Sequence, residues 1–174
     1  EAARQRETSI AKRQSFAMET VMSTPEKIDL MRIARQQGYH VHLEYITTES
    51  PVINLDRIRN RVVDGGHDVP EEKTVSRYDR TMSLLPKAIK TADTARVYNN
   101  SFENPVLIAE KARDQKILIY PQPTPSRWNT EKIIRLLGTE DVVIVTADLE
   151  KKGATITPLS STPTRKQRSS KTRP

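Results

Sequence analysis

Apolar and polar positions in the first half of the chain switch between two periods. Strict alternation over residues 39–46 (YHVHLEYI) predicts a strand, because one face is apolar and the other carries His40, His42 and Glu44. Apolar residues at helical spacing, or runs of helix formers, predict helices over 1–14, 23–38, 50–66 and 70–92. The chain therefore alternates helices with strands.

Capping residues mark the ends of two of these helices. Ser23 or Thr24 stands where a hydroxyl caps a helix start, and Gly38 follows the last turn of that helix. Ser50 and Gly65 hold the same two positions of the next helix. These signals predict where both helices begin and end.

Several other segments have the character of strands. Residues 15–19 (SFAME) predict a short strand that runs into a loop at Thr20. Later segments predict strands at 95–101, 104–111 (paired with 115–121) and 141–149. Trp128 lies in a proline-rich loop before a short helix and is interpreted as a packing anchor. Strands alternating with long helices predict an α/β fold with a mostly parallel sheet.

The ends of these strands hold polar residues. In open α/β sheets, ligands bind at the carboxyl ends of the strands. This rule selects three places: Glu19–Thr20, the segment after Ile46, and residues 99–101 (Asn-Asn-Ser). We expect them to lie on one rim of the sheet.

A glycine pair stands between two of the predicted helices. Gly65 and Gly66 permit a sharp reversal, and Arg61 precedes them while Arg77 follows. Arginine offers a planar fork of donors that suits phosphate oxygens, so a hinged pair of arginines fits phosphoryl transfer. An ordinary helical hairpin with solvated arginines is the alternative.

Two other groups are candidates for chemistry. Glu19, at the end of an apolar segment, could accept a hydrogen bond from a substrate hydroxyl, or it could be a helix cap or half of a surface ion pair. His40 and His42 share one strand face, but no third ligand stands near them, so we interpret both as surface residues and assign no metal site.

Composition narrows the class of protein. The chain has 174 residues, 35% of them hydrophobic, and no cysteine, which excludes disulfides and thiolate metal sites. No apolar run approaches the length of a membrane span, and the charged first residues do not resemble a signal peptide. We therefore expect a soluble, cytoplasmic protein. The first residue is Glu rather than Met, so the natural chain could begin earlier.

Charge is concentrated at the end of the chain. Residues 164–174 (TRKQRSSKTRP) carry +5 of the net +7, which leaves 7 − 5 = +2 for the rest. We expect a kinase-like domain over 1–150 and a basic, disordered tail over 151–174. Such a tail could contact nucleic acid or anionic lipid, or could simply aid solubility.

Taken together, the quoted segments resemble a known family. The series SFAMET, the stretch from Ala34 to Leu85, VYNNS and PVLIAEK looks like the zeta-toxin-type kinases, which are P-loop kinases of bacterial toxin–antitoxin systems. The resemblance runs from about Ala2 to Lys111, and the Gly-Gly-His element between two helices is its most specific part. It implies a parallel sheet of the nucleotide-kinase type with a helical lid.

The resemblance also implies site residues and cofactors. Members transfer the γ-phosphate of ATP with Mg²⁺, the best-described ones to UDP-N-acetylglucosamine, and an antitoxin protein is an expected partner. By position, Glu19 and Thr20 match the substrate side, and Arg61 and Arg77 match the catalytic lid arginines. The cofactor side is matched by Arg57, which competes with Arg61, and by Asn99 and Asn100.

One family element has no counterpart in the sequence. No GxxxxGK[ST] loop occurs, since none of the 5 glycines lies before Gly38. The strand that carries this loop would sit between the strands at Phe16 and Val41, and both would lose a partner without it. We therefore expect an N-terminally truncated kinase sequence that is inactive as it stands. The alternative is a non-catalytic remnant or binding module whose basic tail contacts nucleic acid or a protein.

Overall fold

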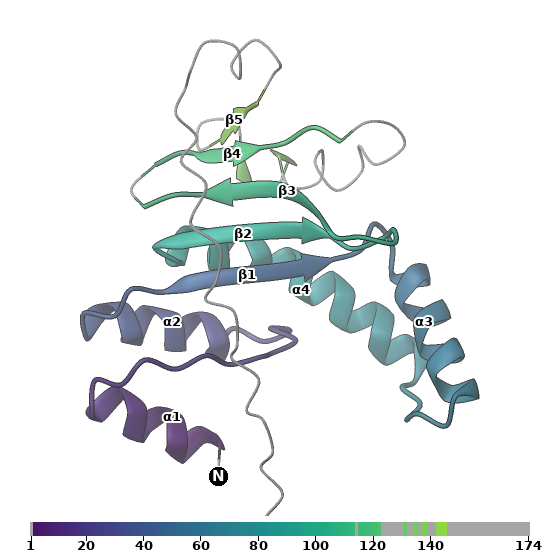
Figure 1. Ribbon diagram of the computed structural model, residues 1–174, viewed down its shortest axis with the longest axis horizontal. Coiled ribbons are helices and arrows are strands. Elements are labelled where there is room, and N and C mark those ends of the chain that lie inside the picture. Colours follow the sequence, from purple (N-terminus) through teal and green to yellow (C-terminus); the bar gives the residue numbers. More distant parts are fainter. Residues whose placement is uncertain are drawn as a thin grey trace, which may run out of the picture.

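The computed structural model describes nine helices and strands along the chain (Figure 1). It describes residues 2–113, 115–122, 131, 134–135, 137–138 and 142–145. In chain order the elements are α1 (Ala2–Ala11), α2 (Glu26–Gln36), β1 (His42–Thr47), α3 (Pro51–Val63), α4 (Glu71–Thr91), β2 (Thr94–Asn99), β3 (Val106–Lys111), β4 (Ile117–Ile119) and β5 (Val142–Ile144). The four helices predicted over 1–14, 23–38, 50–66 and 70–92 and the strand predicted at 39–46 are confirmed.

The five strands form one sheet in the order β1-β2-β3-β4-β5. β1 pairs with β2 in parallel, and β4 pairs with β5 in parallel. β3 runs antiparallel to both of its neighbours, so the sheet is mixed: the predicted common direction is confirmed for β1, β2, β4 and β5, and β3 departs from it. The reason is the length of the connections: residues 100–105 and 112–116 are too short for the crossover of about a dozen residues that a parallel pair needs.

The strand predicted at residues 15–19 does not form. Residues 12–25 contain neither helix nor strand, and β1 lies at the edge of the sheet among the described residues. An isolated extended segment has no partner for its backbone groups, so alternation alone does not make it a strand. Phe16 instead packs edge-to-face on Tyr39, with 6.3 Å between the ring centroids.

The core lies between one face of the sheet and α4. This helix buries Tyr78, Thr81, Met82, Leu85, Ala88 and Ile89 along one stripe. The sheet contributes inward-facing residues such as Tyr45, Val97 and Ala109. α4 continues through Pro86 in one piece. α3, in contrast, buries none of its residues.

Most helix ends follow the expected signals. The Ser50 hydroxyl accepts a hydrogen bond from Val52 N at 3.1 Å, and Gly38 has φ +85° just after α2. The expected cap of α2 is wrong, because neither Ser23 nor Thr24 bonds a backbone N–H at its start. The Thr24 side chain bonds the Glu26 carboxylate instead, which lowers the pKa of Glu26.

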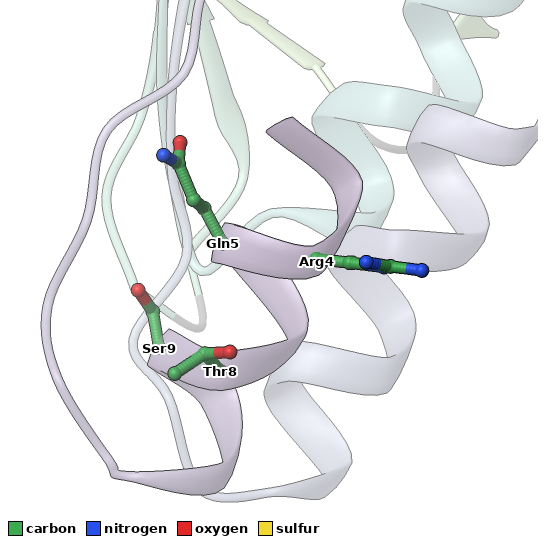
Figure 2. A pocket seen from close by; sticks show the side chains of 4 residues that line it. All are labelled: Arg4, Gln5, Thr8 and Ser9. Atoms are coloured by element: carbon green, nitrogen blue, oxygen red, sulfur yellow. The ribbon is translucent and has the colours of Figure 1, made fainter. Parts of the chain in front are cut away.

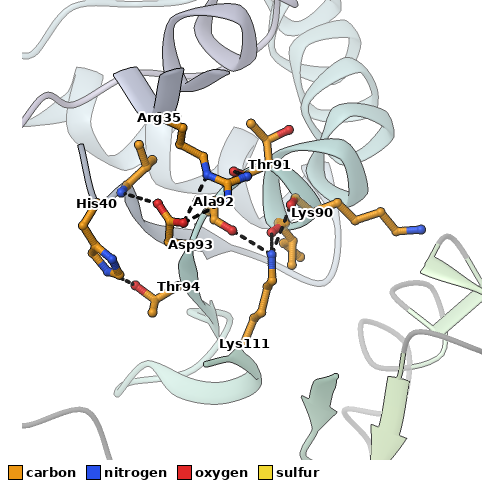
Figure 3. A network of polar contacts seen from close by, with 10 residues as sticks. Arg35, His40, Lys90, Thr91, Ala92, Asp93, Thr94 and Lys111 are labelled. Carbon is orange, nitrogen blue, oxygen red and sulfur yellow. Dashed lines mark hydrogen bonds and ion pairs between the residues drawn. The ribbon is translucent and has the colours of Figure 1, made fainter. Parts of the chain in front are cut away.

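A polar network ties the helices to the amino ends of β1 and β2 (Figure 3). Asp93 is buried and accepts hydrogen bonds from Val41 N at 2.8 Å and from Arg35 Nε at 3.1 Å. Lys111 Nζ reaches across from β3 to three carbonyl oxygens at the end of α4, those of Ile89, Lys90 and Ala92. These contacts lie at the end of the sheet opposite to the predicted site, so we interpret them as scaffold.

Some predictions fall on residues outside the described part of the chain. Trp128 and the tail 151–174 are among them. Of the short helix predicted before Gly138, the described residues are helical, and Leu137 is buried in the core. The strand predicted within 141–149 is confirmed as β5.

Candidate functional site

The carboxyl ends of β1 and β2 lie side by side. Thr47 is the register partner of Asn99, and Asn100 N donates a hydrogen bond to Thr47 O at 2.7 Å. The loop after β1 (residues 48–50) therefore meets the turn after β2 (residues 99–101). Two of the three places selected from the sequence are brought together at this rim.

A closed ring of hydrogen bonds joins this loop to this turn. Glu49 N donates to Ser101 Oγ at 2.7 Å, and Ser101 Oγ donates to Asn99 Oδ1 at 2.6 Å. Asn99 Nδ2 in turn donates to Glu49 Oε1 at 3.2 Å. Ser101 N also donates to Asn99 Oδ1, which fixes the orientation of the amide. Asn99 is 0% exposed, so its side chain takes part in this ring without being presented to solvent.

α3 leaves the rim directly after this ring and carries two of the predicted arginines. Figure 1 shows it projecting beyond the carboxyl ends of β1 and β2. Arg57 Nη2 donates to Asn100 O at 2.7 Å, so this exposed side chain bends back to the turn 99–101. Arg57, Asn99 and Asn100, all expected on the cofactor side, are thus gathered at one place.

The glycine pair makes the tight turn between α3 and α4. Gly65 has φ +84°, a conformation that favours glycine. A Cβ on Gly66 would lie 2.5 Å from Arg61 Cγ and 2.8 Å from Arg61 O, so only glycine fits there. Arg61 Nη2 donates to His67 O at 2.6 Å. Arg61 therefore lies on the turn itself, not at the rim beside Arg57.

One face of α4 links the rim to the Glu19–Thr20 segment. Tyr78 OH donates to Thr48 O at 2.8 Å, and Thr81 Oγ1 donates to Val21 O at 3.1 Å. Burial raises the pKa of the Tyr78 phenol, so it stays a hydrogen-bond donor. Arg77 precedes Thr81 by one helical turn on the same side of α4.

The two residues predicted for the substrate side are exposed. Glu19 and Thr20 both lie on the surface, and the Thr20 hydroxyl accepts a hydrogen bond from Met22 N at 3.1 Å. Met22 is buried and anchors the segment under them. The contact with Thr81 therefore places this segment beside the part of α4 that carries Arg77, a proximity that sequence spacing does not reveal.

Two further side chains complete the rim: Ser101, which the sequence places in the segment 99–101, and Glu49, which was not singled out from the sequence. Glu49 and Ser101 both belong to the ring described above. Each lies in a segment selected because it follows the carboxyl end of a strand, and that position was the available signal. What the sequence did not reveal is that they meet.

The paired histidines take part in a surface contact. His40 Nε2 and His42 Nδ1 both lie near Thr94 Oγ1, at 3.1 and 2.8 Å, and both rings are exposed. Within the described residues, no three His, Asp or Glu side chains group together as a metal site. The exposure of both rings confirms that His40 and His42 are surface residues.

Two shallow hollows lie on the helices. One is lined by Arg4, Gln5, Thr8 and Ser9 of α1, and Figure 2 shows Arg4 pointing away from Gln5, so the side chains do not converge. The other is lined by Leu55, Glu71, Glu72, Val75, Ser76, Asp79 and Arg80 of α3 and α4. Neither hollow contains a residue predicted for the site.

The described structure defines an α/β protein with a helical hairpin, rich in arginine, at the carboxyl rim of its first two strands. The family model for zeta toxin matches residues 2–123, so the chain belongs to the zeta toxin family. This is a family of kinase-like, nucleotide-binding proteins, and it is associated with toxin–antitoxin systems.

Other comparisons add little about activity. The chain is 41% identical over 63 residues to an uncharacterized protein of Haemophilus influenzae. That match covers 36% of this chain and 45% of the relative, so the chain spans about half of its length. No solved structure matches. None of the described helices has the length and apolar character that crossing a membrane requires.

Proposed function

We propose that this protein is an ATP-dependent phosphotransferase that acts on a small-molecule hydroxyl. The observation that carries the proposal is the arginine-bearing hairpin of α3 and α4 at the carboxyl rim, in a chain of the zeta toxin family. Ligands of α/β sheets bind at such rims, and arginines suit the oxygens of a triphosphate.

In the proposed reaction the acceptor hydroxyl oxygen forms a bond to the γ-phosphorus of ATP. The bond from this phosphorus to the β,γ-bridging oxygen breaks, the hydroxyl proton leaves to a base, and the products are ADP and a phosphate monoester. Arg61 and Arg77 stabilise the charge on the transferring group. Arg57 and Asn100 border the nucleotide, and the buried Asn99 holds the turn on which Asn100 lies.

Glu19 and Thr20 form the acceptor side of the proposed site. The Glu19 carboxylate is exposed and can accept a hydrogen bond from the substrate hydroxyl, which orients the oxygen toward phosphorus. The anchoring of this segment beside α4 supports a place close to Arg77. For the acceptor itself we propose a UDP-amino sugar, on the family resemblance.

The residues present fit the phosphates of ATP better than its metal. The side chain of Arg57 is an exposed cation at the rim, and that of Arg61 is an exposed cation on the turn between α3 and α4. Mg²⁺ in kinases is usually held by one or two carboxylates together with phosphate oxygens, and it would neutralise charge on the γ-phosphate. We assign none of the described carboxylates to it. An antitoxin protein is the proposed partner, on the family relationship alone.

ATP turnover by the complete gene product tests the proposal. Residues 1–174 contain no GxxxxGK[ST] loop, so the assay needs the whole protein. We expect phosphate transfer to UDP-N-acetylglucosamine, seen as ADP formation and as a phosphorylated product by mass spectrometry. Arg61→Ala and Arg77→Ala should each lower kcat about 100-fold or more.

A matched variant makes this test specific. Arg32→Ala removes an exposed arginine of α2 that pairs with Asp29 and is remote from the rim, so turnover should be unchanged. Full turnover in both Arg61→Ala and Arg77→Ala would show that the lid assignment is wrong. No turnover with any nucleotide and acceptor would refute the phosphotransferase itself.

A further inference from the structure

We propose that Glu49 is a positioning residue that holds α3, and the arginines on it, against the turn 99–101. The consequence for catalysis rests on the proposed phosphotransferase function. The structural part, a latch between α3 and the sheet rim, stands independently of that function.

α3 needs such a latch because packing holds it only in part, through half-buried residues such as Leu55 that face α4. None of its residues is buried, and Val52 and Val63 are 56% and 86% exposed. Its ion pair to α4, between Arg59 and Glu71, lies on the surface, where such pairs contribute little. The position of α3 must therefore depend largely on polar contacts at its base.

Two of these contacts go to the same turn. Glu49, which immediately precedes the capping residue Ser50, bonds to Asn99 and Ser101. Further along α3, Arg57 bonds to the Asn100 carbonyl oxygen. One contact just before the helix and one within it, both to the same turn, define the direction of α3, so a shift at Glu49 moves the arginines relative to the rim.

The donors and acceptors of the ring match only in one arrangement. Ser101 Oγ has one hydrogen, which it donates to Asn99, so it accepts from Glu49 N. Asn99 Oδ1 is occupied by Ser101, so its amide nitrogen must face the Glu49 carboxylate. Because Asn99 is fully buried, the amide cannot turn to water to compensate for a lost partner.

This arrangement predicts a rescue when the carboxylate and the amide exchange positions. Asn99→Asp would place a carboxylate oxygen where the amide nitrogen now lies, 3.2 Å from the Glu49 carboxylate, and the two charges would repel. Adding Glu49→Gln would supply an amide from the other side and restore the bond with its direction reversed. A residue with a purely local role would show no such coupling.

Hydrogen exchange of residues 51–63, measured by mass spectrometry on the complete protein without nucleotide, tests the latch. We expect Glu49→Ala and Asn99→Asp to speed exchange about tenfold. Glu49→Gln alone retains the acceptor oxygen and should exchange like wild type. The double variant Asn99→Asp/Glu49→Gln should return to within about threefold of wild type. Glu103→Ala removes an exposed carboxylate just past Ser101 and should change nothing.

The proposal is overturned if Glu49→Ala exchanges like Glu103→Ala, or if Glu49→Gln fails to rescue Asn99→Asp. Should Asn99→Asp fail to fold, the comparison of Glu49→Ala with Glu49→Gln still decides, since equal exchange in these two would refute the latch.

Kinetics on the same variants separate the two proposals. If wild type turns over ATP, Glu49→Ala should raise KM for ATP and lower kcat at least about tenfold, and Glu49→Gln should restore both. Normal kinetics in Glu49→Ala would refute the positioning role. If wild type shows no turnover but the exchange results hold, the latch stands and the phosphotransferase fails.

Discussion

Asp93 is the residue whose replacement tests the scaffold most directly. Its carboxylate is 6% exposed and accepts from two different donors, Val41 N through Oδ2 and the Arg35 guanidinium through Oδ1. The Arg35 contact spans 58 positions of the chain, so it fastens α2 to the start of β2. Asparagine has one acceptor oxygen, so Asp93→Asn can satisfy only one of the two donors.

The expected cost follows from these contacts. Arg35 reaches Oδ1 through Nε at 3.1 Å and Nη2 at 3.0 Å, and its side chain is 42% exposed, so water replaces part of what is lost. We expect Asp93→Asn to lower the free energy of unfolding by about 2 kcal/mol. Asp93→Ala also leaves Val41 N without its acceptor, which raises the loss to about 4 kcal/mol.

Urea and thermal denaturation followed by circular dichroism at neutral pH measure these losses. For a domain of this size, about 2 kcal/mol corresponds to a fall in Tm of roughly 4–8 °C. Asp29→Asn is the matched control, because Asp29 also binds an arginine at 3.0 Å but on the surface, and it should cost less than about 0.5 kcal/mol. Equal losses in Asp93→Asn and Asp29→Asn would refute the claim that burial makes the Asp93 contact important.

Further variants test the same structure elsewhere. Burial alone would raise the pKa of Asp93, but the Val41 N–H and the Arg35 charge lower it below its ordinary value of 3.8. The ionised Asp93 carboxylate therefore contributes its full stabilisation of the fold above about pH 5, and this contribution is lost as pH falls through the lowered pKa. Wild type should therefore lose more stability than Asp93→Asn between pH 5 and about pH 2 in denaturant titrations, and parallel curves would contradict this. Gly66→Ala brings its Cβ against Arg61, so the backbone of the turn must open. Gly65→Ala costs only about 1 kcal/mol of backbone strain, because no atom lies near the added Cβ. Hydrogen exchange at the turn should therefore be faster in Gly66→Ala than in Gly65→Ala, and the reverse order would contradict the steric argument. Lys111→Met removes three hydrogen bonds to carbonyl oxygens at the end of α4 and should cost about 2 kcal/mol in urea unfolding, whereas an unchanged midpoint would show that water replaces the ammonium.

Local patterns predicted the elements with few errors. The helix from Ser50 to Gly65 begins and ends at the expected signals, and the alternation around Tyr45 forms β1. Neighbouring residues determine these features, because a helix start needs one capping hydroxyl and a strand face repeats at every second position. The same reasoning failed at residues 15–19, because a strand also needs a partner, and that requirement lies elsewhere in the chain.

The antiparallel direction of β3 could be predicted from the sequence. The segments that form β3 and β4 were predicted to pair, and the few residues before each exclude a parallel crossover. Counting connection lengths would have predicted the mixed sheet.

In the candidate site, too, some features follow from the sequence and others from the tertiary structure alone. The sequence by itself determined the residue types available at the strand ends, the glycine turn after Arg61 and the family to which the chain belongs. Only the tertiary structure decided which of them meet: Glu49 with Asn99, 50 positions apart, and Val21 with Thr81, 60 positions apart. Periodicity reports on residues within a few positions of each other, whereas these pairs are set by the register of β1 on β2 and by the packing of α4, which depend on the whole chain at once.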